Sequence, residues 1–280
     1  MVRNESSYCD YNDAFKGYDQ LRKPNALEEI LQILKQSEIP DKQQRILEGG
    51  FGTGAYIEPI RHHVEEIYGI EGSNEGHRQA THKINGASNV YLQLGNILEL
   101  PFSDDYFQGY MVNQVLHHLD IDPSYPNLDI FLNEAKRALQ PKGTLIINTC
   151  SQEQLDPHLG VYWNYKYIET AALTIRKRYI PLEALISRLE NVGFTNIKKE
   201  IPSRRIYHDR YYEDPSIALE SDFIKGDSVY SFLSGKAIED SYVSLRKAIE
   251  DGSIYEEMKR TVRLAEKIGE VVIVTACQPG

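Results

Sequence analysis

Residues 45–55 read Arg-Ile-Leu-Glu-Gly-Gly-Phe-Gly-Thr-Gly-Ala, and this stretch determines the fold class of the 280-residue chain. A short apolar run ends in Glu48, and glycines then alternate at positions 50, 52 and 54. The pattern is typical of a strand, a tight turn and the first turn of a helix, which we expect to begin at Thr53 or Gly54. Glycine permits backbone dihedrals that a Cβ atom forbids, so the backbone can approach a nucleotide-like ligand closely.

Two cofactor classes fit this loop. As G-x-G-x-x-G/A it matches the dinucleotide fingerprint, with Glu71 about 20 residues further on as the acid that binds the ribose. As acid-x-G-x-G-x-G the motif begins at Glu48. A carboxylate at that place would attract a cationic amino-acid group and repel a pyrophosphate.

Three further segments favour the second interpretation. They are Tyr68–Ser73, which is an apolar strand ending in an acid, then Leu94–Leu119, and then Glu134–Ile147. Over roughly residues 43–150 this ordered series resembles the class I S-adenosylmethionine (SAM) methyltransferases, and in particular the small-molecule enzymes of ubiquinone and menaquinone biosynthesis. The resemblance implies SAM as cofactor and S-adenosylhomocysteine as product. A nicotinamide dinucleotide is the second candidate.

The alternation of strands and helices predicts an α/β fold with a parallel, doubly wound sheet. The resemblance implies a Rossmann-like sheet of seven strands, whose last strand lies antiparallel between the fifth and sixth. The expected strands are Arg45–Glu48, Glu66–Glu71, Val90–Leu94, Gln108–Asn113, Thr144–Thr149, Phe194–Ile201 and Glu270–Cys277.

We expect three parts in the chain. Residues 1–42 form an N-terminal helical lid, with a helix opened by Pro24, and residues 43–202 and 270–280 form the SAM-binding core. Residues 203–269 form a helical insertion that covers the active site, because a structureless loop of about 65 residues is implausible inside a compact domain. Apolar spacing predicts two helices in it, near 237–250 and 254–268.

The resemblance also implies the cofactor contacts. The motif from Glu48 surrounds the methionine part, Glu71 binds the ribose, and Asn96 with Ile97 meets the adenine. The full expected set is Tyr18, Arg22, Glu48, Gly50, Gly52, Gly54, Glu71, Gly72, Ser73, Asn96, Ile97, Asn113 and Gln114. Tyr18 and Arg22 come from the lid and would cover the methionine end and its carboxylate.

For catalysis we expect His117 and Tyr18, since histidine is a suitable base near neutral pH. His117 is followed by His118, but adjacent residues on a helix point about 100° apart, so we expect no shared metal. The expected acceptor-binding residues are His117, Tyr162, Tyr165, Tyr207 and Tyr211. Their rings offer an apolar face to a cationic methyl donor and a polar tip to a substrate.

Composition limits the partners. The chain has 41 Asp and Glu against 31 Lys and Arg, so we expect no nucleic acid. Its three cysteines are far apart, which argues against a zinc site and suits a reducing compartment. The first residues lack the apolar core of a signal peptide, and no run is long enough to span a bilayer, so we expect a cytoplasmic enzyme without membrane insertion. The oligomeric state is left open.

The sequence therefore predicts a SAM-dependent methyltransferase for a small molecule. The alternative is an enzyme of the same fold that cyclises or cleaves SAM and releases methylthioadenosine. Such an enzyme would have a small pocket closed by aromatic residues, because aromatic faces stabilise a sulfonium whichever nucleophile attacks it. A protein that binds SAM without turnover is a third candidate. No acid pair, thiolate or metal cluster commits the acceptor atom to O, N, C or S.

Overall fold

The computed structural model describes residues 15, 18–202 and 205–280. Seven strands form one sheet in the order β3-β2-β1-β4-β5-β7-β6. They are β1 (Arg45–Gly49), β2 (Glu66–Glu71), β3 (Val90–Leu94), β4 (Phe107–Asn113), β5 (Leu139–Thr149), β6 (Thr195–Glu200) and β7 (Val272–Cys277). The first five strands are parallel, and β7 is antiparallel to both β5 and β6. The expected Rossmann-like class, with its antiparallel last strand, is confirmed.

Several element boundaries differ from expectation. The ends of β1, β4, β6 and β7 differ by one or two residues, and two differences are larger. Strand β5 begins at Leu139 and not at Thr144, because Leu139 pairs with Phe107 across an irregularity in the β4–β5 ladder. The helix after the glycine loop, α4 (Ile57–Ile60), begins later than Thr53 or Gly54. Gly54 has a φ of 76°, in the left-handed region, so the right-handed helix starts only after it.

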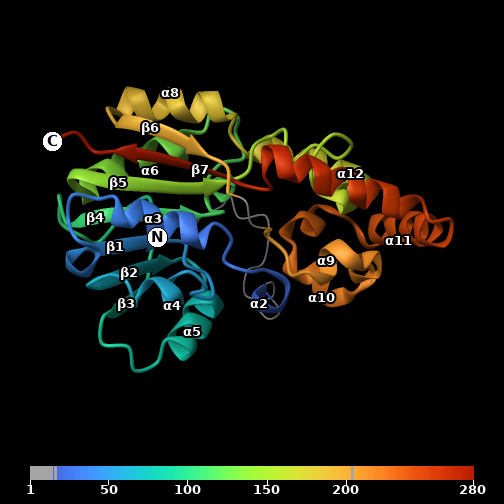
Figure 1. The fold of residues 1–280 in the computed structure, drawn as a ribbon, viewed down its shortest axis with the longest axis horizontal. Coiled ribbons are helices and arrows are strands. Elements are labelled where there is room, and N and C mark those ends of the chain that lie inside the picture. The colour runs from blue at the N-terminus through green and yellow to red at the C-terminus, as the bar shows by residue number, and fades with distance from the viewer. Residues whose placement is uncertain (1–14, 16–17, 203–204) are drawn as a thin grey trace.

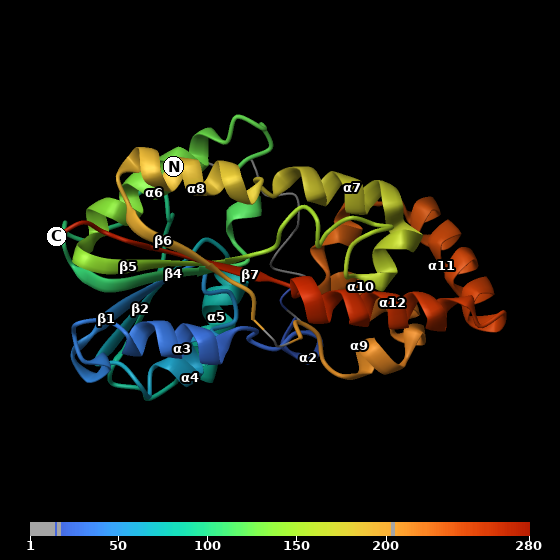
Figure 2. The same cartoon turned by 45° about the horizontal axis from the view of Figure 1, so that its top comes forward.

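Helices cover both faces of the sheet (Figures 1 and 2). One face carries α3 (Leu27–Lys35), α4 and α5 (Asn74–Lys83), and the other carries α6 (Pro126–Ala138) and α8 (Leu182–Val192). Successive strand residues point to opposite faces. Ile46 accordingly packs in the apolar cluster under α3, while Leu47 packs in the cluster under α6. The helix α3 begins at Leu27 and not at Pro24, because Ala26 has a φ of 57°.

A second, helical region lies beyond the carboxyl ends of the parallel strands (Figure 1). It contains η4 (Trp163–Ile168), α7 (Glu169–Arg178), α9 (Arg210–Glu213), η5 (Pro215–Leu219), α10 (Ser221–Gly226), η6 (Ser228–Phe232), α11 (Gly235–Glu250) and α12 (Ser253–Ile268). The helices expected near 237–250 and 254–268 are α11 and α12. Residues 205–269 share one apolar cluster with residues 150–179, so the insertion has no core of its own.

Three short helices complete the described chain: α2 (Tyr18–Leu21), η2 (Asp41–Gln43) and η3 (Leu116–His118).

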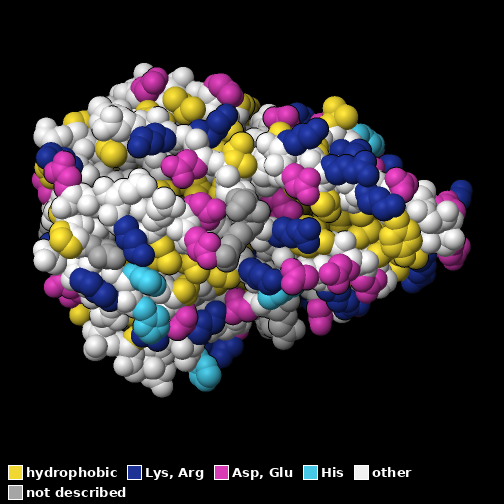
Figure 3. All heavy atoms as spheres, viewed as in Figure 1, with side chains coloured by type: hydrophobic (Ala, Val, Ile, Leu, Met, Phe, Trp, Pro, Cys, Tyr) yellow, Lys and Arg dark blue, Asp and Glu magenta, His cyan; other side chains and the backbone are white. Residues whose placement is uncertain are grey.

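On the face drawn in Figure 3, Lys and Arg side chains are interspersed with Asp and Glu. Within the described ranges, no helix combines the length and the apolar character needed to cross a bilayer.

Candidate functional site

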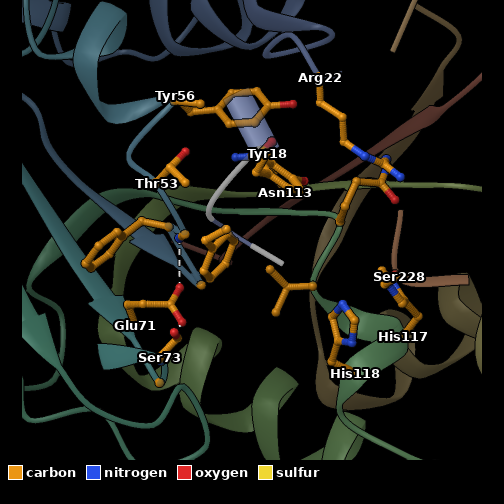
Figure 4. A pocket seen from close by; sticks show the side chains of 18 of the residues that line it. Tyr18, Arg22, Thr53, Tyr56, Glu71, Ser73, Asn113, His117, His118 and Ser228 are labelled. Carbon is orange, nitrogen blue, oxygen red and sulfur yellow. Dashed lines mark hydrogen bonds between the residues drawn. The ribbon is translucent and has the colours of Figure 1, made fainter. Parts of the chain in front are cut away.

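A cavity of about 820 Å³ opens where the carboxyl ends of the strands meet the second region. This volume lies in the upper part of the range of about 300–1,000 Å³ that small-molecule sites occupy. Its walls come from four parts of the chain: α2, the loops after β1 to β4, residues 150–179 and residues 206–229. In Figure 4, Glu71 and Ser73 lie on one side of the cavity, and His117, His118 and Ser228 lie on the other.

Glu71 ends β2 and holds the glycine loop in place. The backbone N–H of Gly52 donates to its Oε2 atom at 2.7 Å, and the backbone N–H of Ser73 donates to its Oε1 atom at 2.7 Å. Burial raises the pKa of the Glu71 carboxyl, and these backbone hydrogen bonds oppose the rise. Each carboxylate oxygen has a second acceptor position, so Glu71 can also receive the two hydroxyls of a ribose diol.

Glu48, at the end of β1, is 1% exposed and lines the same cavity. Its Oε1 atom accepts a hydrogen bond from Asn113 Nδ2 at 2.9 Å. Its buried Oε2 atom has no hydrogen-bond partner among the described residues. Burial raises the pKa of Glu48 from its ordinary value of 4.5 to about 8, while the Asn113 bond opposes the rise. An unsatisfied buried carboxylate is costly, so the site fits a ligand that brings a cationic donor.

A row of amides fixes Glu48 across neighbouring strand ends. Asn148, on β5, is in register with Asn113 on β4. Its Nδ2 donates to Asn113 Oδ1 at 3.2 Å, to Asn25 Oδ1 at 2.9 Å and to the Tyr56 hydroxyl at 3.2 Å. Our sequence analysis missed Asn148, Asn25 and Tyr56. The available signal was an asparagine at the end of an otherwise apolar strand.

Gln114 follows β4 with a φ of 56°, which is uncommon for a residue other than glycine. Its backbone N–H donates to the Asn148 carbonyl at 2.8 Å, and its Oε1 accepts from the Tyr179 hydroxyl at 3.2 Å. Such a conformation costs about 1–3 kcal/mol and persists where the surroundings hold it, often at functional sites. At Gln114 this conformation changes the chain direction between the end of β4 and η3, which contains His117 and His118.

His117 and His118 lie on the far wall, and their ring centroids are 3.8 Å apart. The two rings are in contact, with an angle of 47° between their planes, and His117 also stacks on Tyr179 at 4.3 Å. Burial lowers the pKa of His117 well below its ordinary value and that of His118 to about 3, and Arg178 acts in the same direction. Both imidazoles are neutral at neutral pH. No group of three or more His, Cys, Asp or Glu that could hold a metal occurs in the described chain.

Residues 21–23, at the end of α2, contact residues 206–208 and Asp227 beside the cavity. Arg22 Nη2 donates to Asp227 Oδ1 at 3.0 Å and to the Tyr207 hydroxyl at 3.2 Å, and the Tyr207 hydroxyl donates to Asp227 Oδ2 at 2.7 Å. Two backbone hydrogen bonds, Lys23 N–H to the Ile206 carbonyl and His208 N–H to the Leu21 carbonyl, join the same segments, each at 3.2 Å. Arg22 therefore lies where the two segments meet, and its Nη2 atom is ion-paired with Asp227, a residue that our sequence analysis missed.

The lid also contacts the glycine loop. The Thr53 hydroxyl donates to Asp19 Oδ1 at 2.5 Å, and Lys83 pairs with Asp19 Oδ2 at 2.5 Å. Tyr18 lines the cavity beside them, and burial raises its pKa, so its phenol is neutral.

Most of the expected site residues line the cavity. This group is Tyr18, Arg22, Glu48, Gly50, Gly52, Glu71, Gly72, Ser73, Asn96, Ile97, Asn113, Gln114, His117, Tyr162, Tyr165 and Tyr207.

Two expected site residues, Gly54 and Tyr211, do not line the cavity. A Cβ atom on Gly54 would lie 3.0 Å from both Ala80 Cβ and Ile84 Cδ1, so this glycine allows α5 to pack closely. Tyr211 stacks behind Tyr207 at 4.2 Å and donates its hydroxyl to Asn164 Oδ1 at 2.7 Å. Tyr211 therefore packs behind Tyr207, which lines the cavity.

Residues 47–147, which run from β1 to β5, match the family model described as a methyltransferase domain. This part of the chain is a methyltransferase domain, and the sheet has the class I fold. The expected cofactor, SAM, is confirmed at the level of this methyltransferase family. The ubiquinone and menaquinone subtype stays a prediction, because the family model is described only as a methyltransferase domain.

Solved structures share the fold of this methyltransferase domain. One, from Anabaena variabilis, is described as a methyltransferase from an antibiotic biosynthesis pathway; it is 20% identical, with a TM-score of 0.69, over 91% of this chain and 98% of that one. Phosphoethanolamine N-methyltransferase 2 of Haemonchus contortus, in complex with SAM, is 17% identical, with a TM-score of 0.55, over 90% and 53%. The [4+2]-cyclase SpnF is 17% identical, with a TM-score of 0.51, over 90% and 80%. A search of curated proteins found no match.

The buried Glu48 carboxyl should make stability depend on pH. Its pKa is higher in the folded chain than in the unfolded chain, so its contribution is fully present below pH 4.5 and is lost as the pH rises to about 8. At pH 8, Glu48→Gln should raise the free energy of unfolding by about 1–3 kcal/mol, the cost of a buried group without a partner. Urea unfolding across this pH window measures the effect.

The matched control is Glu65→Gln, which changes an exposed acid just before β2. It should leave the pH dependence of unfolding as in the unmodified chain. Equal pH dependence in the unmodified chain and in Glu48→Gln would contradict the assignment of Glu48.

Proposed function

We propose that this chain is a SAM-dependent methyltransferase, an enzyme of the EC 2.1.1 type, that acts on a small-molecule acceptor. The unpartnered Oε2 atom of Glu48 carries the proposal, because Glu48 lines a cavity whose walls also contain Glu71 and the glycine loop. SAM has an ammonium group that matches Glu48 and a ribose diol that matches Glu71. Its cationic sulfur lies between these two groups.

In this proposal Glu48 binds the ammonium of SAM, and Glu71 accepts hydrogen bonds from the two ribose hydroxyls. The loops after β2 and β3 enclose the adenine through Gly72, Ser73, Asn96 and Ile97, all of which line the cavity. Asn113, Gln114 and Tyr18 also line the cavity and would surround the sulfonium. The polar groups of the site are already held by protein hydrogen bonds, so little ordering is needed on binding.

SAM supplies an electrophilic methyl group on a positively charged sulfur. The protein mainly has to hold the acceptor in line with that methyl group and exclude water. Neutral aromatic rings such as Tyr18 can face the cationic donor. We propose that His117 contacts the acceptor and orients it by a hydrogen bond. Its lowered pKa makes it a weak base, so positioning contributes more than proton removal.

The cavity volume disfavours the alternative in which SAM is cyclised or cleaved. That chemistry needs room for the cofactor alone, in a small pocket closed by aromatic residues. The observed cavity of about 820 Å³ continues past the strand ends of β4 and β5 into a tyrosine-lined space. The likeness to the SpnF cyclase concerns the fold alone.

The proposal is tested by product analysis. Incubation of the protein with SAM and a library of small molecules should give S-adenosylhomocysteine only when an acceptor is present. Glu71→Ala should weaken SAM binding at least tenfold in a calorimetric titration, because charge-assisted hydrogen bonds contribute about 1.5–3 kcal/mol each. Glu65→Ala, at the opposite end of β2, is the control and should bind normally. Methylthioadenosine formed without any acceptor would contradict methyl transfer.

The role of His117 is tested by His117→Asn. Asparagine can still form a hydrogen bond but does not fill the same space, so we expect kcat/KM to fall about tenfold, the effect of one displaced neutral hydrogen bond. SAM affinity should not change. Rates should be flat between pH 6 and 8, because the imidazole is already neutral there. A loss of about 10²–10⁴ together with a falling acid limb in this range would instead identify a general base.

A further inference from the structure

The part of the cavity that extends past β4 and β5 has a chemistry different from that of the glycine-loop side. We call it the acceptor half. Because the strand order is β3-β2-β1-β4-β5, residues that follow β4 and β5 lie away from the ribose-binding acid on β2. The acceptor half is lined mainly by aliphatic and aromatic side chains, including Leu155, Ile175, Val229, Tyr162, Tyr165 and Tyr207.

The tyrosine hydroxyls of the acceptor half are largely used within the protein. The Tyr162 hydroxyl donates to the Glu270 carbonyl at 2.7 Å, and the Tyr179 hydroxyl donates to Gln114 at 3.2 Å. The Tyr207 hydroxyl donates to Asp227 at 2.7 Å. These tyrosines therefore offer a ligand mainly their rings. Aromatic rings pack best against flat apolar groups, in stacked or edge-to-face arrangements.

The acceptor half also lacks net charge. Arg22 is the one Lys or Arg among the described lining residues, and its guanidinium is ion-paired with Asp227. The two side chains are 15% and 2% exposed, so water does little to screen or replace this pair. Burial lowers the pKa of both histidines and raises the pKa of the Cys150 thiol to about 11, so these groups are neutral as well.

Burying an ion without a counter-ion is costly. An anionic acceptor would need a free cation, and a cationic acceptor would need a free carboxylate. In the acceptor half, Arg22 and Asp227 offset each other's charge through the ion pair between Arg22 Nη2 and Asp227 Oδ1. The other lining carboxylates, Glu48, Glu71 and Glu99, follow or end β1, β2 and β3 on the cofactor side.

We propose that the acceptor is an uncharged small molecule that contains a ring, and that Asp227 sets this selectivity by neutralising Arg22. The inference rests on the proposed methyltransferase function and adds the substrate class. Asp227 acts here as a specificity-determining residue. Removing either member of the pair should leave the other charge in the cavity wall and change which ligands bind.

The test uses three probes with the same ring system and different charge at neutral pH: 2-naphthol, 2-naphthoate and 2-naphthylmethylammonium. Each is titrated calorimetrically into protein saturated with S-adenosylhomocysteine. The uncharged 2-naphthol should bind at least tenfold more tightly than either ion. Equal affinities, tighter binding of an ion or no binding of 2-naphthol would overturn the inference.

Two reciprocal variants test the role of the ion pair. Asp227→Asn leaves Arg22 without its counter-ion, so the affinity for 2-naphthoate should rise at least tenfold. Arg22→Met leaves Asp227 unpaired, so the affinity for 2-naphthylmethylammonium should rise instead. Asp222→Asn, which changes an exposed acid on α10, is the matched control and should behave as the unmodified chain. Unchanged charge preference in both variants would overturn the role of Asp227.

Binding of S-adenosylhomocysteine is measured first, in the unmodified chain and in every variant. Failure of the unmodified chain to bind it would refute the proposed function. Normal binding of S-adenosylhomocysteine together with a preference for 2-naphthoate would refute only the inference about the acceptor. For each variant, this measurement also shows that the fold is intact.

Discussion

The site is organised around one buried carboxylate. Glu48 ends β1, almost fully withdrawn from solvent, with one oxygen bound to Asn113 and the other unpartnered within the described chain. Three adjacent parallel strands end there, since Asn113 ends β4 and lies in register with Asn148, the second-last residue of β5. A charge at this place is tolerated only if a cation joins it or the group stays protonated. The structure thus keeps a destabilising group where a ligand can satisfy it.

The sheet and the second region have separate apolar clusters, and they form the two sides of the cavity. The sheet and its flanking helices fix the glycine loop, Glu48 and Glu71. The helical region between β5 and β7 has its own apolar cluster and supplies the tyrosine-rich wall. The contact between Arg22 and Asp227 connects the short lid helix to this second region. We infer that cofactor recognition and acceptor recognition can vary independently, since different cores support them.

The sequence predicted the sheet well because strand alternation and the glycine motif are local signals. Strands β2 and β3 have the predicted bounds, and Glu48 and Glu71 line the cavity as expected. Other features depend on contacts between distant segments. Examples are the pairing of Arg22 with Asp227 and the stacking of His117 on Tyr179. Gly54 packs against α5 and does not line the cavity, because a motif glycine can serve helix packing as well as a ligand.

The central claim is that Glu48 is protonated in the free protein and receives the ammonium group of SAM. Calorimetric titration of SAM in buffers of different ionisation enthalpy, between pH 5 and 8, measures the protons released on binding. We predict that binding releases a proton from the unmodified chain and that this release is absent in Glu48→Gln. Equal proton release from both proteins, or none from the unmodified chain, would contradict the account.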